Sequence, residues 1–378
     1  MNIRTITLGI PFDNRNPAKP VKHAAQFLHT AKKQLAQGNI EVQTIRLSTN
    51  IWDYKDITVK QALSIVRELD KATADEGIDF FNLGTASYAG HIQAIPEVLA
   101  ESPRAFSTAT ICSENTIDYR ALEAAAPIVG KLAEIEHEGF ANLRFAVLAN
   151  LAPGAPFFPG AYHRGKPAFS LGFENSGIVY NVFSQNTDIS TAAAELQTEF
   201  EQVYKPIETE CLRLAKEWDI IYGGLDVSIA PSVAPHESIA YAVEQLGIPE
   251  FGLPGTLTAA ATITEALRKI AVKTCGYSGL MLPVLEDYGL AERNAAHRFN
   301  LQNLLLYSSV CGTGLDTIPL PGDLSEEDIY HIFFDVASLS AKLNKPLSAR
   351  LMPIPGKRAG DTTNFDFDYF VNSKVMHV

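Results

Sequence analysis

The C-terminal third of the chain contains the stretch LSARLMPIPGKRAGD, residues 347–361, in which an apolar run ends in a turn rich in glycine, proline and charge. A second apolar run, LLLYSSV at residues 304–310, ends in the same way at CGTGLDTIPLPGD, residues 311–323. In α/β proteins, strands that end in polar turns present functional groups at the mouth of a sheet or barrel. Both stretches therefore predict buried strands with a candidate site at the turns that follow.

Strand-like runs alternate with helical segments along the whole chain, and several runs are apolar on both faces, which is typical of strands covered by helices. Helices are indicated by a capping box at Thr58 and Gln61, by Ser325 before three acidic residues, and by an apolar stripe over 192–218. This alternation predicts an α/β fold with a largely parallel sheet. The predicted strands cover residues 3–10, 40–47, 78–83, 104–112, 143–149, 168–173, 220–227, 280–285, 304–310 and 347–354.

The number of strands and the length of 378 residues allow one large barrel or two sheets. A chain of this size buries roughly 75% of its unfolded surface, so no disulfide or metal is needed to stabilise its core. The sequence contains no flexible linker and no repeat, and the apolar segment 152–160 is interpreted as a packed loop. We therefore expect a single domain over residues 1–378.

Composition excludes several classes of partner. The net charge of -12 and the lack of a basic stripe argue against binding to nucleic acid or to an anionic membrane. No apolar run reaches the roughly 18 residues needed to span a bilayer, and the first ten residues are too polar for a signal peptide. Four cysteines without a C-x-x-C pair favour reduced thiols. These features predict a cytoplasmic protein.

Three charged residues of the stretch 347–361 are candidates for binding a ligand. Arg350 lies on the strand face opposite to Ala349 and Leu351, where it is either a bidentate anchor for a carboxylate or phosphate or a structural ion pair with an acid of a neighbouring strand. Lys357 follows Gly356 in a turn whose backbone can approach an anion closely, and Asp361 belongs to the same turn.

Four carboxylates follow apolar runs and are candidates for acid–base catalysis. They are Glu174, Asp226, Glu286 and Asp316. Asn175 and Ser228 lie beside two of them and are candidates for ligand binding. If the carboxylates converge, their oxygens would suit Mg²⁺ or Mn²⁺, although acids at strand ends are common and Asp316 alternatively closes a turn.

Two further residues are candidates on weaker grounds. Cys311 is a potential nucleophile near basic residues, but most free cysteines are buried and inert. Thr256 opens a helix whose N-terminus offers free N–H groups to an anion, and it equally suits a simple capping role. The chain has no G-x-G-x-x-G, Walker, H-E-x-x-H or nucleophile-elbow motif, so motifs alone name no reaction.

Five segments together resemble one family, the bacterial and archaeal domain of unknown function 711. They are residues 3–10, 225–231, 281–287, 310–323 and 347–361. The resemblance implies a ten-stranded α/β barrel similar to that of pyruvate formate-lyase, built from two five-stranded halves, and it implies no established activity. We place the boundary between the halves near 150–190. Glycyl radical enzymes of that fold need a C-terminal glycine loop, which is lacking in the ending FVNSKVMHV, residues 370–378.

Together these observations predict an enzyme that acts on a small anionic metabolite by acid–base or metal-assisted chemistry in the lumen of a barrel. Arg350 and Lys357 are expected to hold the anion, and no radical chemistry is expected. The alternative is a metabolite-binding or regulatory protein without catalysis. We also expect the chain to form a homo-oligomer.

Overall fold

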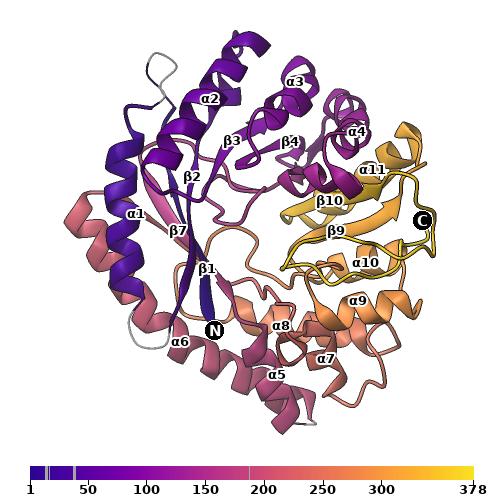
Figure 1. Ribbon diagram of the computed structural model, residues 1–378. Helices are drawn as coiled ribbons and strands as arrows, with labels where there is room; N and C mark the ends of the chain where they lie inside the picture. The colour runs from indigo at the N-terminus through magenta and orange to yellow at the C-terminus, as the bar shows by residue number, and fades with distance from the viewer. Residues whose placement is uncertain (13–15, 17, 37–39, 187) are drawn as a thin grey trace.

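The computed structural model describes residues 1–12, 16, 18–36, 40–186 and 188–378, and within them ten strands form one mostly parallel sheet. Figure 1 shows the strands around the middle of the molecule and the helices as a layer outside them. The α/β class predicted from the alternating pattern is confirmed. The strands are β1 (Asn2–Gly9), β2 (Val42–Ser48), β3 (Phe80–Ala86), β4 (Ala105–Ser113), β5 (Thr116–Ile117), β6 (Phe145–Ala149), β7 (Ala168–Glu174), β8 (Ile221–Asp226), β9 (Gly314–Pro321) and β10 (Leu347–Ile354).

In the described part of the chain, the helical layer consists of α-helices of 6 to 30 residues and three 3₁₀ segments. The α-helices are α1 (Val21–Leu35), α2 (Val59–Asp75), α3 (Ala89–Ala100), α4 (Tyr119–Ala133), α5 (Ser176–Gln185), α6 (Ile189–Trp218), α7 (Ile239–Glu244), α8 (Thr256–Arg268), α9 (Tyr288–Ala295), α10 (Leu301–Ser308) and α11 (Glu326–Leu343). The 3₁₀ segments are Ile51–Asp53, His137–Arg144 and Pro235–Glu237.

The sheet consists of two groups of parallel strands joined in antiparallel fashion. Its order is β8-β7-β1-β2-β3-β4-β6-β10-β9, and the short β5 pairs with β4. Strands β1, β2, β3, β4 and β6 are mutually parallel, whereas β7 runs antiparallel to β1 and β10 runs antiparallel to β6. The N-terminal ends of the first group therefore lie at the same edge as the C-terminal ends of the second.

The two outermost strands do not pair with each other in the described part of the chain. A segment between them instead forms single bridges to both sides. Thr274 and Leu280 bridge to Leu225 and Ile229 at the β8 side, and Pro283 bridges to Asp316 of β9. The sheet is thus not closed by a continuous hydrogen-bonded ladder.

Two of the predicted strands are wrong. Residues 304–310 belong mostly to α10, because Asn300 and Asn303 form a capping box and Leu301, Leu304 and Leu305 follow helical spacing. The strand of this region is β9, which begins only at Gly314. Residues 280–285 form no strand, since Pro283 cannot donate to a ladder and only isolated bridges remain.

The helix signals and the packed loop are confirmed. Thr58 with Gln61, and Ser325 with Asp328, form capping boxes at the starts of α2 and α11. The segment 152–160 runs against the inner face of the sheet, where three of its carbonyls accept hydrogen bonds from buried strand side chains. Ser170 Oγ donates to Gly154 O at 2.7 Å. Thr7 Oγ1 donates to Pro156 O at 2.7 Å, and Asn82 Nδ2 donates to Pro159 O at 2.7 Å.

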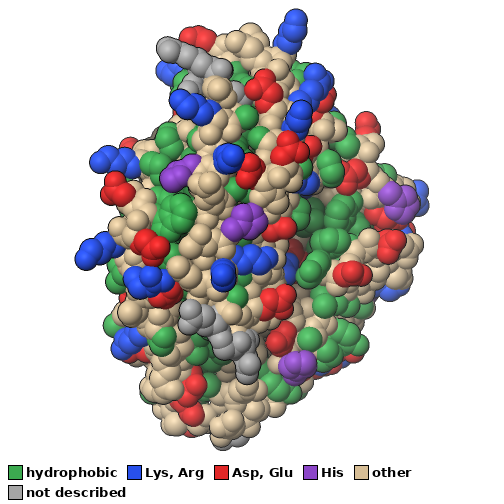
Figure 2. All heavy atoms as spheres, turned by 60° about the vertical axis from the view of Figure 1, so that its left-hand side comes forward, with side chains coloured by type: hydrophobic (Ala, Val, Ile, Leu, Met, Phe, Trp, Pro, Cys, Tyr) green, Lys and Arg blue, Asp and Glu red, His purple; other side chains and the backbone are tan. Residues whose placement is uncertain are grey.

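The largest apolar cluster runs from Ile3 to Met376 and includes side chains of both strand groups. No described helix combines the length and the apolar character needed to cross a membrane. Figure 2 shows one face of the molecule, on which basic and acidic side chains are interspersed.

Candidate functional site

A cavity of about 560 Å³ lies at the N-terminal ends of the first strand group and faces the first halves of β9 and β10 and the segment that follows β8. This is within the size range of small-molecule sites. Its charged walls contain Arg4, Glu41, Arg46, Asp79, Glu286, Asp316 and Arg350. Its aromatic walls contain Phe80, Phe106, Phe157, Phe158, Tyr277, Phe367 and Tyr369.

Arg350 of β10 forms the centre of a buried charged cluster. Its Nε donates to Asp316 Oδ1 of β9 at 2.6 Å, and its Nη2 donates to Glu286 Oε1 at 2.7 Å. Burial raises the pKa of Glu286, with Arg350 opposing this rise and Asp316 adding to it. Of the two roles expected for Arg350, the structure shows the ion pair with an acid of the neighbouring strand.

Arg46 of β2 lies in the same cavity without such a partner. Its side chain is packed between the rings of Phe80 and Phe158, with the guanidinium carbon 5.6 and 5.2 Å from their centroids. Arg46 is 9% exposed, and the only hydrogen bond from its side chain to a described residue runs from Nε to Thr44 Oγ1 at 2.9 Å. The neighbouring Asp79 accepts a backbone bond from Ile45 and forms no ion pair with Arg46 in the described part of the chain. The terminal nitrogens therefore remain available to a ligand.

The pKa of Arg46 is lowered to about 9, mainly by burial and also by the positive charges of Arg4 and Arg350, while the negative charges of Asp79 and Glu286 oppose this. A guanidinium removed from water beside other cations is costly unless an anion compensates it. The electrostatics of Arg46 thus favour a negatively charged group beside it.

Arg4 of β1 lines the cavity and connects it to one predicted residue. Arg4 Nη1 donates to Glu174 Oε2 at 3.3 Å and to Gln43 Oε1 at 3.0 Å. Its guanidinium carbon lies 4.9 Å from the centroid of the Tyr369 ring. Glu174 is therefore the partner of a cavity arginine and not itself part of the wall.

Asp226 does not face the cavity but orders a loop that does. This buried carboxylate accepts hydrogen bonds from the backbone N–H groups of Tyr277 and Ser278, at 3.0 and 2.9 Å, and from Ser228 Oγ at 2.6 Å. Burial raises the pKa of Asp226, and these hydrogen bonds oppose the rise. Gly276, with φ of +62°, has no room for a Cβ because it would overlap Asp226 Oδ2. Tyr277 is consequently held in the cavity wall.

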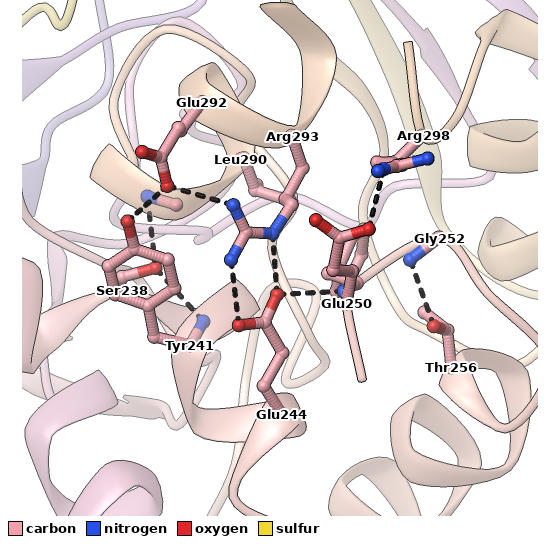
Figure 3. Close-up of polar contacts among 12 residues, drawn as sticks. Ser238, Tyr241, Glu244, Glu250, Gly252, Thr256, Leu290, Glu292, Arg293 and Arg298 are labelled. Atoms are coloured by element: carbon pink, nitrogen blue, oxygen red, sulfur yellow. Dashed lines mark hydrogen bonds and ion pairs between the residues drawn. The ribbon is translucent and has the colours of Figure 1, made fainter. Parts of the chain in front are cut away.

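Of the remaining candidates, four have structural hydrogen bonds outside the cavity, and Ser228 is the donor to Asp226 described above. Asn175 Nδ2 donates to Tyr204 OH and to Ser228 O, at 2.6 and 3.0 Å. Thr256 Oγ1 accepts from the N–H of Gly252 at 3.0 Å, in the network of α7, α8 and α9 shown in Figure 3. Asp361 Oδ2 accepts from the N–H of Arg358 at 2.7 Å.

The last two candidates also lie outside the cavity wall. Lys357 Nζ donates to Thr362 O at 2.6 Å and lies 3.6 Å from Glu138 Oε2, so it closes its own turn. Cys311 is fully buried just after α10. Neither is among the residues that line the cavity.

Of the four carboxylates that were considered together for a metal, Glu286 and Asp316 meet at Arg350, whereas Glu174 and Asp226 lie outside the cavity wall. Glu174 is bonded to Arg4, and Glu286 is bonded to Arg350. Asp287, next to Glu286, accepts from Ser238 Oγ and from the N–H of Leu290 at the start of α9. Among the residues that the structure describes, no group of three or more His, Cys, Asp or Glu side chains is arranged to hold a metal ion.

Sequence reasoning missed Arg46, Arg4 and Tyr277. The signal for Arg46 was present, because it lies between Ile45 and Leu47 in a predicted strand, as Arg350 lies between Ala349 and Leu351. Nothing in the sequence near Tyr277 distinguishes it from an ordinary loop tyrosine.

Comparisons with known proteins agree on one family. The family described as Uncharacterised ACR (DUF711) matches residues 1–367. A UPF0210 protein of Pyrobaculum arsenaticum is 31% identical over 360 residues, which cover 90% of this chain and 79% of that protein. UPF0210 proteins of Oenococcus oeni and Desulforudis audaxviator are each 27% identical, with 96% and 97% of this chain covered and 88% of each relative. The chain therefore belongs to the DUF711 family, and none of these descriptions names an activity.

Proposed function

We propose that the cavity binds a small organic anion through Arg46 and that Glu286 and Asp316 carry out acid–base chemistry on it. The observation that carries this proposal is a buried arginine whose terminal nitrogens have no partner among the described residues. It faces the same cavity as a carboxyl group with a raised pKa. Buried cations that lack a protein partner favour anionic ligands, and shifted carboxyl groups are typical of catalytic acids and bases.

This assignment moves the anion from Arg350 and Lys357 to Arg46. Arg350 already faces two carboxylates, so an added anion would be repelled by their excess negative charge. Lys357 is engaged in its own turn. Arg350 instead orients Glu286 and Asp316, and Asp226 holds the loop that carries Tyr277.

We also propose that the sheet is the barrel implied by the family resemblance. The five parallel strands β1, β2, β3, β4 and β6 would form one half. The other half would contain β7, β8, β9 and β10, with residues 274–283 in the position of its fifth strand. The bridges from this segment to Leu225, Ile229 and Asp316 support that arrangement.

Binding is tested by calorimetric titration of the purified chain with a panel of small carboxylates and inorganic phosphate. We expect Arg46→Met to raise the Kd of the bound anions at least about 30-fold, because loss of a buried charge-assisted contact costs about 2 kcal/mol or more. Arg67→Met is the matched control, since Arg67 is exposed and pairs with Glu101 outside the cavity. Equal affinities of the two variants for every anion would refute the proposal.

Catalysis is tested separately from binding. Glu286→Gln preserves the size of the side chain and an acceptor for Arg350 but removes the titrating group. In an enzyme, this variant should still bind the anion while its turnover of the bound compound falls by about 10²-fold or more. A regulatory protein that only binds the metabolite would leave the compound unchanged in both forms, which mass spectrometry of the recovered ligand detects.

A further inference from the structure

The cavity has two separate charge imbalances of opposite sign. On β2, the guanidinium of Arg46 lacks a carboxylate partner in the described part of the chain. On β10, the single guanidinium of Arg350 faces both Asp316 and Glu286. One positive charge therefore lacks an ion-pair partner in one part of the wall, with Asp79 and Glu286 acting on it only through space, and one carboxylate is in excess in another.

The excess carboxylate can accept further hydrogen bonds. Arg350 contacts only Oδ1 of Asp316 and Oε1 of Glu286. No described residue donates to Oδ2 of Asp316 or to Oε2 of Glu286, and both side chains are about one-fifth exposed, at 19% and 21%. A ligand group that donates hydrogen bonds and carries positive charge would satisfy these oxygens.

The two charged groups share one cavity and influence each other. Glu286 raises the pKa of Arg46, and Arg46 lowers that of Glu286, although burial remains the largest effect on each. A plain anion bound at Arg46 would leave one carboxylate of the Glu286–Asp316 pair in excess over Arg350 and would face its negative charge. A molecule with an anionic and a cationic end would compensate both.

The wall next to Arg46 is apolar and aromatic. The Phe106 ring lies 5.6 Å from that of Phe80 and 5.1 Å from that of Phe158, measured between centroids. Met281 and Phe157 also line the cavity. A ligand whose carboxylate binds Arg46 would therefore place its carbon frame against hydrocarbon surface, where an apolar side chain gains most from burial.

We propose that the ligand of this cavity is an α-amino acid with an apolar side chain, whose carboxylate contacts Arg46 and whose ammonium group contacts Glu286 and Asp316. This inference rests on the proposed function, because it specifies the chemical class of the anion that Arg46 binds.

The test compares amino acids with the same acids lacking the amino group. L-leucine and L-phenylalanine are titrated into the chain at pH 7.5 beside 4-methylpentanoate and 3-phenylpropanoate. At least one amino acid should bind ten-fold or more tightly than its matched acid. Glu286→Gln should remove this preference. It should raise the Kd of the amino acid at least ten-fold, while the matched acid binds as well as it does to the wild-type chain or more tightly. Asp316→Asn should act in the same direction and serves if the first variant does not fold.

The inference is overturned if the matched acids bind as well as the amino acids, if no amino acid binds, or if the acidic variants weaken both series equally. These outcomes differ from failure of the proposed function. Arg46-dependent binding of 3-phenylpropanoate alone would leave the anion site intact and remove only the amino-acid assignment. Loss of all Arg46-dependent binding, in this series and in the wider panel of anions, would remove both.

Discussion

At the scale of single residues, Arg350 shows how a buried charge acts through its partners. It is 8% exposed, and its two carboxylates come from different segments, β9 and the turn before α9. Removing one member of a buried ion pair leaves uncompensated charge in a medium of low polarity, which costs far more than loss of an exposed pair. Arg350 is therefore expected to stabilise the fold as well as orient the two acids.

We predict that Arg350→Met lowers the free energy of unfolding at pH 7 by about 3–5 kcal/mol. The loss should be smaller at pH 5, because the carboxyl groups left without Arg350 take up protons more readily. Urea unfolding followed by circular dichroism measures both values. Arg67→Met removes the exposed pair with Glu101 and should cost no more than about 1 kcal/mol. If the two variants lost similar free energies of unfolding, the prediction that the buried Arg350 cluster stabilises the fold more than an exposed ion pair would be wrong.

Residue patterns alone identified part of this site. Arg350, Asp316 and Glu286 were predicted as candidates, and the structure brings these three together in one cavity. The pattern could not show that Arg350 is already neutralised, because a strand sequence does not reveal which acid lies on the neighbouring strand. For the same reason Asp226 looked like a catalytic acid, whereas its oxygens are used by the backbone of a loop about fifty residues later.

At the scale of elements, errors arose where an apolar run fits both a helix and a strand. Residues 304–310 are apolar enough for a buried strand, but the capping pair Asn300 and Asn303 starts a helix just before them. The true strand β9 includes Pro319 and begins with Gly314, whose φ is +94°. Gly314 packs so closely on Ser348 of β10 that a Cβ would collide with its backbone. Such tertiary constraints are not visible in a local pattern.

Asp287 links two helices and should make stability depend on pH. It accepts from Ser238 Oγ and the N–H of Ile239 at the start of α7, and from the N–H of Leu290 in α9. Ser238 and Leu290 are drawn in Figure 3. Burial raises the pKa of Asp287 to about 6, above the value near 3.9 of an unfolded chain. The folded state therefore binds this proton more tightly than the unfolded chain does. The stabilisation that protonated Asp287 provides is complete below about pH 4 and is lost as pH rises through about 6.

We predict that the wild-type chain gains stability relative to Asp287→Asn by about 2 kcal/mol as pH falls from 7 to 4.5. The asparagine variant should be less stable throughout, because its amide N–H₂ replaces an acceptor of backbone N–H groups. Urea unfolding of both proteins across this range gives the difference. Asp188→Asn is the control, since Asp188 caps α6 at the surface and its hydrogen bonds with Ser190 and Thr191 lower its pKa to about 2. The difference in free energy of unfolding between Asp188→Asn and the wild-type chain should stay nearly constant above pH 4.5.

At the scale of the whole molecule, the two strand groups depend on each other. The first group would leave β1 and β6 as exposed edges if β7 and β10 were not paired with them. The main apolar cluster also takes side chains from both groups. The α/β class could be predicted from alternation, but the strand count of ten agrees only because β5 and β9 replace two wrongly predicted strands. The antiparallel joining of the groups has no signal in local periodicity and was not predicted. The number of subunits stays a prediction.

This interdependence predicts that residues 1–378 unfold as one cooperative unit. The chain has two tryptophans, Trp52 beside the first strand group and Trp218 at the end of α6, where it packs against Phe27 of α1. Trp52→Phe and Trp218→Phe therefore each leave one fluorescent reporter, one beside the first group and one at the contact between the helices of the two groups. In urea, the fluorescence transition of each variant should have the same midpoint as its own helical transition measured by circular dichroism, because neither group retains a complete core without the other. A fluorescence midpoint that clearly precedes or follows the loss of helix in either variant would show that the two groups fold as separate domains.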